Sequence, residues 1–225
     1  EVLTLSRLAV RHFPGRGRVV CGVSRPGGDP AGLAEKIKGV ADTGAAAAVV
    51  LVSELAAADE DDEILLRRAD RLLALTPELP LGLYECPRPY HRKLGEAALA
   101  QLAGSGRFHF FKDTCCDLER IRRRLALLAG TPLRLFNANA ATLLDSFRAG
   151  ADGYCGVGTN YYPALFRELF DRMNSPRAET LQRFIAENDR LADLGRAYPC
   201  SAKYMMALHG VPVAQHCRIT ERRLG

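Results

Sequence analysis

Lys112 is the residue whose position most suggests chemistry, because it ends the apolar stretch Phe108–Lys112. Strand alternation predicts that Phe108 and Phe110 lie on the same face as Lys112. A lysine held above two buried aromatic rings would have a partly desolvated ammonium group, which lowers the pKa of the amine. Such an amine can attack a carbonyl carbon and form a Schiff base. The alternative is a strand-ending lysine that points into solvent.

Tyr84 is a second candidate, in the stretch LGLYECP over residues 81–87. It shares a predicted strand face with Gly82, which has no side chain and leaves room beside the phenol. The Tyr84 hydroxyl could therefore relay a proton. Taken alone, a core tyrosine with a satisfied hydroxyl is the better interpretation.

Other reactive residue types point to no cofactor. The run Asp152–Pro163 contains Gly156 and Gly158 but lacks the third glycine and the helix start of a dinucleotide-binding motif. The seven cysteines have no CxxC or Cys/His spacing typical of metal sites, so we expect reduced thiols in a cytoplasmic protein. We expect neither a metal nor an organic cofactor.

Short apolar stretches alternate with longer helical patterns, which indicates βαβ units and a parallel sheet. Strands are expected at Arg18–Ser24, Ala47–Ser53, Leu81–Glu85, Phe108–Lys112, Leu133–Asn137 and Gly153–Gly158. Helices are expected after Asp29, in the region that opens with the acidic run Asp59–Glu63, and over Asp117–Ala129, Ala140–Ala149, Pro163–Met173, Pro176–Leu194 (stopped by Gly195) and Cys200–His209. Six such strands fit part of a (β/α)₈ barrel or an open doubly wound sheet, and periodicity does not separate the two.

Composition argues against two partner classes. The 225 residues carry a net charge of only +5, and the arginines are dispersed, so a nucleic-acid partner ranks well below a small molecule. The basic residues 120 and 122–124 are interpreted as a solvated helix face. No apolar run approaches the roughly 20 residues of a membrane span.

Lys112 and Tyr84, with their surroundings, resemble the dihydrodipicolinate synthase/N-acetylneuraminate lyase family. LGLYECP resembles the family's strand-five Tyr-x-x-Pro motif, and FFKDTCCDLERI resembles its strand-six segment. LRLFNANAATLLDSFRAGADGYCGVGTNYYP resembles strands seven and eight, and PCSAKYMMALHGV resembles a late Pro-x-x-x-K helix. The resemblance covers nearly the whole chain.

This resemblance implies a (β/α)₈ barrel whose strands three to eight occupy residues 1–162, with C-terminal helices in residues 163–225 packed on the barrel. It implies that Lys112 forms an imine with pyruvate or another 2-keto acid and that Tyr84 moves protons. It further implies a cytoplasmic homo-oligomer, a dimer or a tetramer. About two more βα elements are expected before Glu1, because the barrel needs eight strands.

The resemblance also assigns three substrate-binding positions. The strand-eight position whose backbone touches the keto acid corresponds to Cys155. The strand-seven glycine near the substrate corresponds to Ala138, which departs from the family. Glu1 matches the last residue of the Gly-Thr-Thr-Gly-Glu loop that holds the keto-acid carboxylate. The rest of that loop would belong to the elements before Glu1, so residues 1–225 alone are expected to trap keto acids poorly.

Two departures argue against true synthase activity. The tyrosine pair after strand four is replaced by SELAAADED, and the arginine that binds the aldehyde carboxylate falls at Pro89, with Arg88 adjacent. We therefore expect an aldolase or dehydratase that acts on another 2-keto acid, such as one derived from a sugar. The alternative is a barrel that binds a keto or sugar acid without turning it over.

Overall fold

The computed structural model describes all residues except 14, 16, 26–28, 77, 193–197 and 219–225. The chain divides into two compact units, Glu1–Phe136 and Asn137–Gly225. Among the described residues, no helix has the length and apolar character needed to cross a membrane.

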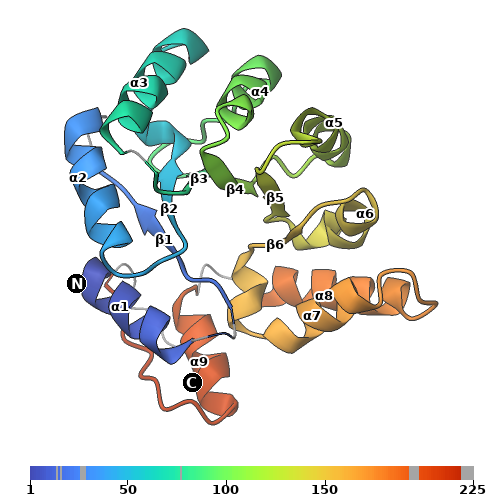
Figure 1. Cartoon of the computed structure of the whole chain (residues 1–225). Coiled ribbons are helices and arrows are strands. Elements are labelled where there is room, and N and C mark those ends of the chain that lie inside the picture. The colour runs from blue at the N-terminus through green and yellow to red at the C-terminus, as the bar shows by residue number, and fades with distance from the viewer. Residues whose placement is uncertain (14, 16, 26–28, 77, 193–197, 219–225) are drawn as a thin grey trace. The chain divides into compact units, whose positions relative to one another are not determined.

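The first unit alternates strands and helices. Its elements are α1 Val2–His12, β1 Val20–Val23, α2 Pro30–Ala41, β2 Ala47–Leu51, η1 Val52–Glu54, α3 Asp62–Leu75, β3 Leu81–Tyr84, α4 Glu96–Gly104, β4 Phe108–Asp113, α5 Leu118–Leu128 and β5 Arg134–Asn137, which ends on the first residue of the second unit. The sheet order is β1-β2-β3-β4-β5-β6, and the pairs from β1 to β4 are parallel. Helices α2 to α5 lie along one face of these strands (Figure 1).

Local sequence explains where these helices begin. The Asp29 carboxylate accepts hydrogen bonds from two backbone N–H groups of α2, and Pro30 occupies the first turn, as predicted. Asp117 caps α5 in the same way. Helix α4 was not predicted, because its N-cap Gly95 has no side chain to mark the start, although its alanine-rich sequence favours a helix.

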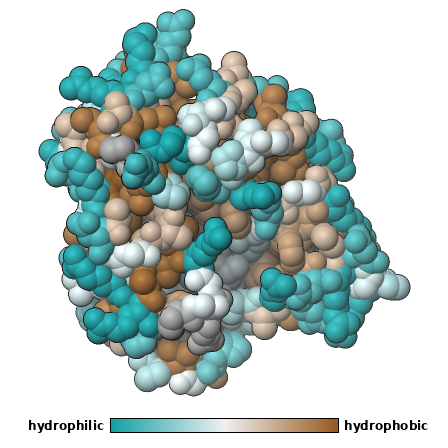
Figure 2. Space-filling view, in the orientation of Figure 1, coloured by the Kyte–Doolittle hydropathy of each residue, from teal (hydrophilic) through white to brown (hydrophobic). Residues whose placement is uncertain are grey.

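The core of the first unit lies between the sheet and helices α2 to α5. Leu83 on β3 and Phe111 on β4 are fully buried there. Helix α3 shows the corresponding pattern, since Leu65 and Leu72 are fully buried while Arg67 is exposed. The outer surface over α2 and α3 is accordingly mainly hydrophilic (Figure 2).

One irregularity in β4 corrects a prediction. Leu81 pairs with Phe108 but Gly82 pairs with Phe110, so the exposed His109 is an extra residue in the register. Phe108 therefore lies on the buried face of Leu81, while Phe110 lies on the opposite face. The prediction that Phe108 shares a face with Lys112 is wrong, because strict alternation does not anticipate a bulge.

The second unit is mostly helical. Its elements are η2 Ala140–Thr142, α6 Leu143–Arg148, β6 Gly153–Tyr154, η3 Val157–Asn160, α7 Pro163–Asp171, α8 Ala178–Ala192 and α9 Cys200–Leu208. The three predicted C-terminal helices are confirmed, and the predicted stop at Gly195 lies outside the described residues. Strand β6 is shorter than predicted, because the chain turns into η3 directly after Gly156.

Aromatic and amide contacts hold the second unit together. The Tyr154 and Phe166 rings stack with centroids 4.5 Å apart, and the Phe147 and Phe170 rings meet edge to face at 5.0 Å. The Gln182 amide on α8 accepts from Leu144 N at 2.9 Å and donates to Ala140 O at 2.8 Å. These bonds fix η2 and the start of α6 against α8.

Candidate functional site

Tyr84 and Lys112 lie side by side at the carboxyl ends of neighbouring strands. In the sheet register, Tyr84 pairs with Lys112 on β4 and with Leu51 on β2. The Lys112 Nζ lies 4.2 Å from the centroid of the Tyr84 ring. Both side chains are half-buried. The structure thus brings together the two residues that the sequence singled out, while their roles stay predictions.

Lys112 lies on the face of β4 that points away from the helices. Its neighbours Phe111 and Asp113 are fully buried and face α5, where the Arg124 guanidinium lies 5.2 Å from the Phe111 ring centroid and bonds to Asp113. Because successive side chains of a strand alternate, Lys112 occupies the opposite face. Lys112 therefore shares a face with Phe110 but not with Phe108.

An aromatic floor lies on the Lys112 face. The Phe110 ring stacks on Phe136 of β5, with centroids 4.6 Å apart. Gly82 is needed for this packing, since a Cβ there would stand 2.9 Å from Val49 Cγ2 and 3.1 Å from Phe110 Cβ. The space that Gly82 leaves is thus filled by Val49 and Phe110. The aromatic residues on the Lys112 face are thus Phe110 and Phe136, rather than Phe108 and Phe110 of its own strand.

The basic stretch of α5 includes one residue that the sequence misjudged. Arg122 and Arg123 are exposed and pair with Glu119 and Glu96, as a solvated helix face would. Arg124 is instead fully buried and forms ion pairs with Glu85 and Asp113. Its burial could have been inferred from its position three residues after the core residue Ile121, on the same side of the helix.

Of the two cysteines that closely follow Lys112, Cys115 is buried and Cys116 is exposed. Burial, together with a hydrogen bond to Asp113, raises the pKa of the Cys115 thiol to about 12. A thiol with that pKa is neutral at physiological pH. The Cys115 thiol is therefore not a nucleophile at that pH, and the Cys115 backbone N–H donates to Asp113 Oδ1 at 2.7 Å.

A cavity of about 650 Å³ opens beside the carboxyl ends of β1 to β3. Its lining includes Arg88 and Pro89, where the resemblance leads one to expect an arginine, and Ser53 and Glu54, in the segment where it leads one to expect a tyrosine pair. Glu54 is buried and accepts a hydrogen bond from Ser24 Oγ at 2.6 Å. The two positions that depart from the expected pattern thus line one cavity.

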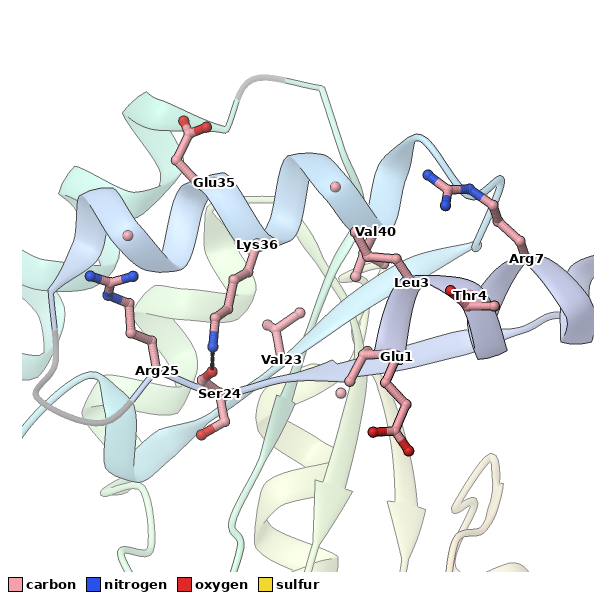
Figure 3. A pocket seen from close by; sticks show the side chains of 14 residues that line it. Glu1, Leu3, Thr4, Arg7, Val23, Ser24, Arg25, Glu35, Lys36 and Val40 are labelled. Carbon is pink, nitrogen blue, oxygen red and sulfur yellow. Dashed lines mark hydrogen bonds between the residues drawn. The ribbon is translucent and has the colours of Figure 1, made fainter.

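Glu1 lines a different cavity, of about 700 Å³, formed by α1, α2 and the end of β1 (Figure 3). Lys36 points from α2 toward Ser24 and donates a hydrogen bond to its carbonyl oxygen. Among the described residues that line this cavity, neither Lys112 nor Tyr84 occurs. The carboxylate-binding role expected near Glu1 therefore stays a prediction.

Ala138 and Cys155 belong to the second unit. Asn137 is buried and fixes the turn after β5, because its Oδ1 accepts from Asn139 N at 2.8 Å. Its carbonyl oxygen accepts from Cys155 N at 2.8 Å. Ala138 and Cys155 are thus held next to each other through Asn137, and their contact with a keto acid stays a prediction. In the described part of the chain, no group of three or more His, Cys, Asp or Glu residues could hold a metal ion.

Two curated proteins are similar to parts of this chain. The 4-hydroxy-tetrahydrodipicolinate synthase of Xylella fastidiosa is 31% identical over 93 residues, which cover 41% of this chain and 30% of that protein. The corresponding synthase of Synechococcus is 28% identical over 142 residues, covering 61% and 46%. The chain thus spans less than half the length of the curated relatives it matches.

Solved structures of similar fold cover nearly all of this chain. The dihydrodipicolinate synthase of Acinetobacter baumannii, determined with pyruvate, superposes with a TM-score of 0.84 at 21% identity and covers 99% of this chain and 75% of its own. This likeness confirms the predicted (β/α)₈-barrel fold, with six strands and a C-terminal helical extension in the described part of this chain. The Dihydrodipicolinate synthetase family profile matches residues 59–220, well over half of the sequence. The chain belongs to the dihydrodipicolinate synthetase family.

Proposed function

We propose that this chain forms a Schiff base between Lys112 and the keto carbon of a 2-keto acid, as the first step of an aldolase-type lyase reaction. The observation that carries the proposal is the pairing of Lys112 Nζ with the Tyr84 ring at 4.2 Å, on adjacent strand ends. Pyruvate is the simplest substrate, because the Acinetobacter synthase was solved with it.

The chemistry requires an amine and a proton carrier at one place. The neutral Lys112 amine attacks the keto carbon, and the resulting carbinolamine loses its hydroxyl as water after taking up a proton. Tyr84 offers a phenol on the neighbouring strand that can deliver and then recover that proton. The protonated imine then withdraws electrons from the adjacent carbon, so that a carbon–carbon bond can break or form there.

The second reactant differs from that of a true synthase. Ala56 and Ala57 stand in the segment that replaces the tyrosine pair, and the Tyr90 hydroxyl donates to the Ser53 carbonyl oxygen of that segment at 2.7 Å. The buried Glu54 also lines this cavity, where its carboxyl group accepts a hydrogen bond from Ser24 Oγ at 2.6 Å. An aldolase or dehydratase acting on a hydroxylated, sugar-derived keto acid fits these residues better.

The test is reductive trapping of the purified gene product. The protein is incubated with a panel of 2-keto acids and borohydride, and the adduct is located by peptide mass spectrometry. We expect a reduced adduct on Lys112 with at least one keto acid. Lys112→Arg should abolish it, whereas Lys93→Arg, at an exposed lysine, should leave it unchanged.

Failure of trapping would overturn the Schiff-base mechanism. If a keto acid still raised the melting temperature of the untrapped protein, the barrel would be a binding protein without turnover, because a ligand that binds only the folded state stabilises it. An adduct found on another lysine would also refute the role of Lys112.

A further inference from the structure

Arg124 of α5 joins two carboxylates in the core of the first unit. Its Nη1 lies 3.0 Å from Glu85 Oε2 and 2.5 Å from Asp113 Oδ2, and its Nη2 lies 2.6 Å from Glu85 Oε1. Nη2 also donates to the carbonyl oxygen of Leu94 at 3.0 Å. The side chains of all three charged residues are fully buried. The guanidinium therefore fixes both carboxylates at once.

Each carboxylate directly follows a residue of the candidate site. Glu85 comes after Tyr84, and Asp113 comes after Lys112. Because side chains alternate along a strand, the cluster lies on the helix side of the sheet, directly behind the pair. A shift of either carboxylate would be passed through one peptide unit to the neighbouring functional side chain.

Further bonds connect the same backbone. Glu85 N donates to the carbonyl oxygen of Lys112 at 3.3 Å, and Thr114 Oγ1 donates to the carbonyl oxygen of Glu85 at 2.5 Å. Glu85 Oε1 accepts from Leu94 N at 2.8 Å. The ends of β3 and β4 are thus tied to each other and to the loop before α4, with Arg124 at the centre.

Stability alone is a poor explanation for this cluster. Two buried carboxylates face one guanidinium, and Arg124 Nε has no hydrogen-bond partner among the described residues. Buried ion clusters are often no more stabilising than apolar residues of similar volume, because each charge is costly to desolvate. The planar guanidinium fixes the orientation of its partners, because it can bond two carboxylates at fixed angles, which a lysine ammonium group cannot do.

We propose that Arg124 is a positioning residue, which holds Lys112 against Tyr84 by fixing the carboxylates that follow them. The inference deepens the Schiff-base function and rests on it for its catalytic consequence. The geometric part can be tested without catalysis, because Lys112 Nζ lies over the Tyr84 ring. A ring current in that position shifts the lysine ε-methylene protons upfield.

The test compares Arg124→Lys with Arg107→Lys in lysine-labelled protein by NMR. Arg107 directly precedes β4, at the strand end far from Lys112, and its guanidinium donates to the carbonyl oxygens of Thr76 and Leu79. We expect an upfield Lys112 signal in the wild type and in Arg107→Lys, and its loss in folded Arg124→Lys. An unchanged signal in folded Arg124→Lys, or no upfield signal in the wild type, would overturn the proposal.

A second variant covers the case in which Arg124→Lys does not fold. Asp113→Asn removes the charge that follows Lys112 and one of the two acceptors that bind Cys115 N and Arg124 Nη1, and it leaves the bonds between Arg124 and Glu85 in place. Its Lys112 signal should also move toward that of an unconstrained lysine, and a folded Asp113→Asn protein with the wild-type signal would contradict the proposal.

Trapping kinetics give the catalytic consequence. A misplacement of about 1 Å can cost up to about 100-fold in rate, so we expect imine formation with pyruvate to slow by about 10- to 100-fold in Arg124→Lys and not in Arg107→Lys. An equal slowing in both variants would mean a general structural effect and refute positioning. If the wild type forms no adduct, the proposed function fails while the NMR comparison still decides the role of Arg124.

Discussion

Replacing Gly82 with alanine should destabilise the protein through the face that carries Tyr84 and Lys112. The new Cβ would stand 2.9 Å from Val49 Cγ2 and 3.1 Å from Phe110 Cβ and the Phe110 carbonyl oxygen. β3 cannot move away, because it is paired on both sides, with β2 and β4. Overpacking of this kind costs about 1–3 kcal/mol. The lower entropy of the unfolded alanine chain returns about 0.4–1 kcal/mol.

The expected net loss is about 1–2 kcal/mol. For a chain of this size that corresponds to a fall of roughly 2–8 °C in melting temperature. Thermal unfolding measures it directly. Gly104→Ala is the matched control, because a Cβ there meets no atom within 4 Å and alanine favours the helix α4.

Gly104→Ala should therefore be neutral or slightly stabilising. A Gly82→Ala protein as stable as the wild type would show that the face of β3 is not packed against Val49 and Phe110. Equal losses in both variants would point to an effect of glycine replacement in general. Gly82→Ala should also slow trapping at Lys112, because the new Cβ would displace Phe110, which lies on the same face of β4 as Lys112.

Three further predictions follow from individual contacts. Tyr84→Phe keeps the ring beside Lys112 but removes the phenol, so trapping of a keto acid should slow by about 10²- to 10⁴-fold with little change in melting temperature, and an unchanged rate would exclude proton relay by Tyr84. Asp117→Ala removes the bonds from Glu119 N and Arg120 N, so the free energy of unfolding in urea should fall by about 1 kcal/mol, and a loss near zero would contradict the capping role. Burial raises the pKa of the Cys115 thiol to about 12, so iodoacetamide at pH 8 should label the exposed Cys116 and leave Cys115 unmodified until the protein unfolds. Peptide mapping would show which cysteine is labelled. Rapid labelling of Cys115 in the folded protein would argue against its burial.

The sequence was sufficient for the order of the strands and for most of the helices, although not for α4, and it singled out Lys112 and Tyr84. Apolar runs such as Ala47–Leu51 and helix signals such as Asp29 and Pro30 act over a few residues, so they can be read without tertiary information. Lys112 and Tyr84 stood out for the same reason, because each ends an apolar stretch. Their pairing followed from the parallel arrangement of neighbouring strands.

Tertiary structure decided what depends on neighbours distant in sequence. The extra residue at His109 places Phe108 on the helix side of the sheet. The aromatic ring that packs beside Phe110 on the Lys112 face is therefore Phe136 of β5 and not Phe108. In the sequence, Arg124 looks like another exposed arginine of a basic helix. In the structure, Glu85 and Asp113, at the ends of two strands, form ion pairs with it in the core. The local pattern of apolar residues indicates which side of an element is buried and where the element starts. Strand register and the burial of charged residues depend instead on contacts between distant segments, which form only when the strands and helices pack.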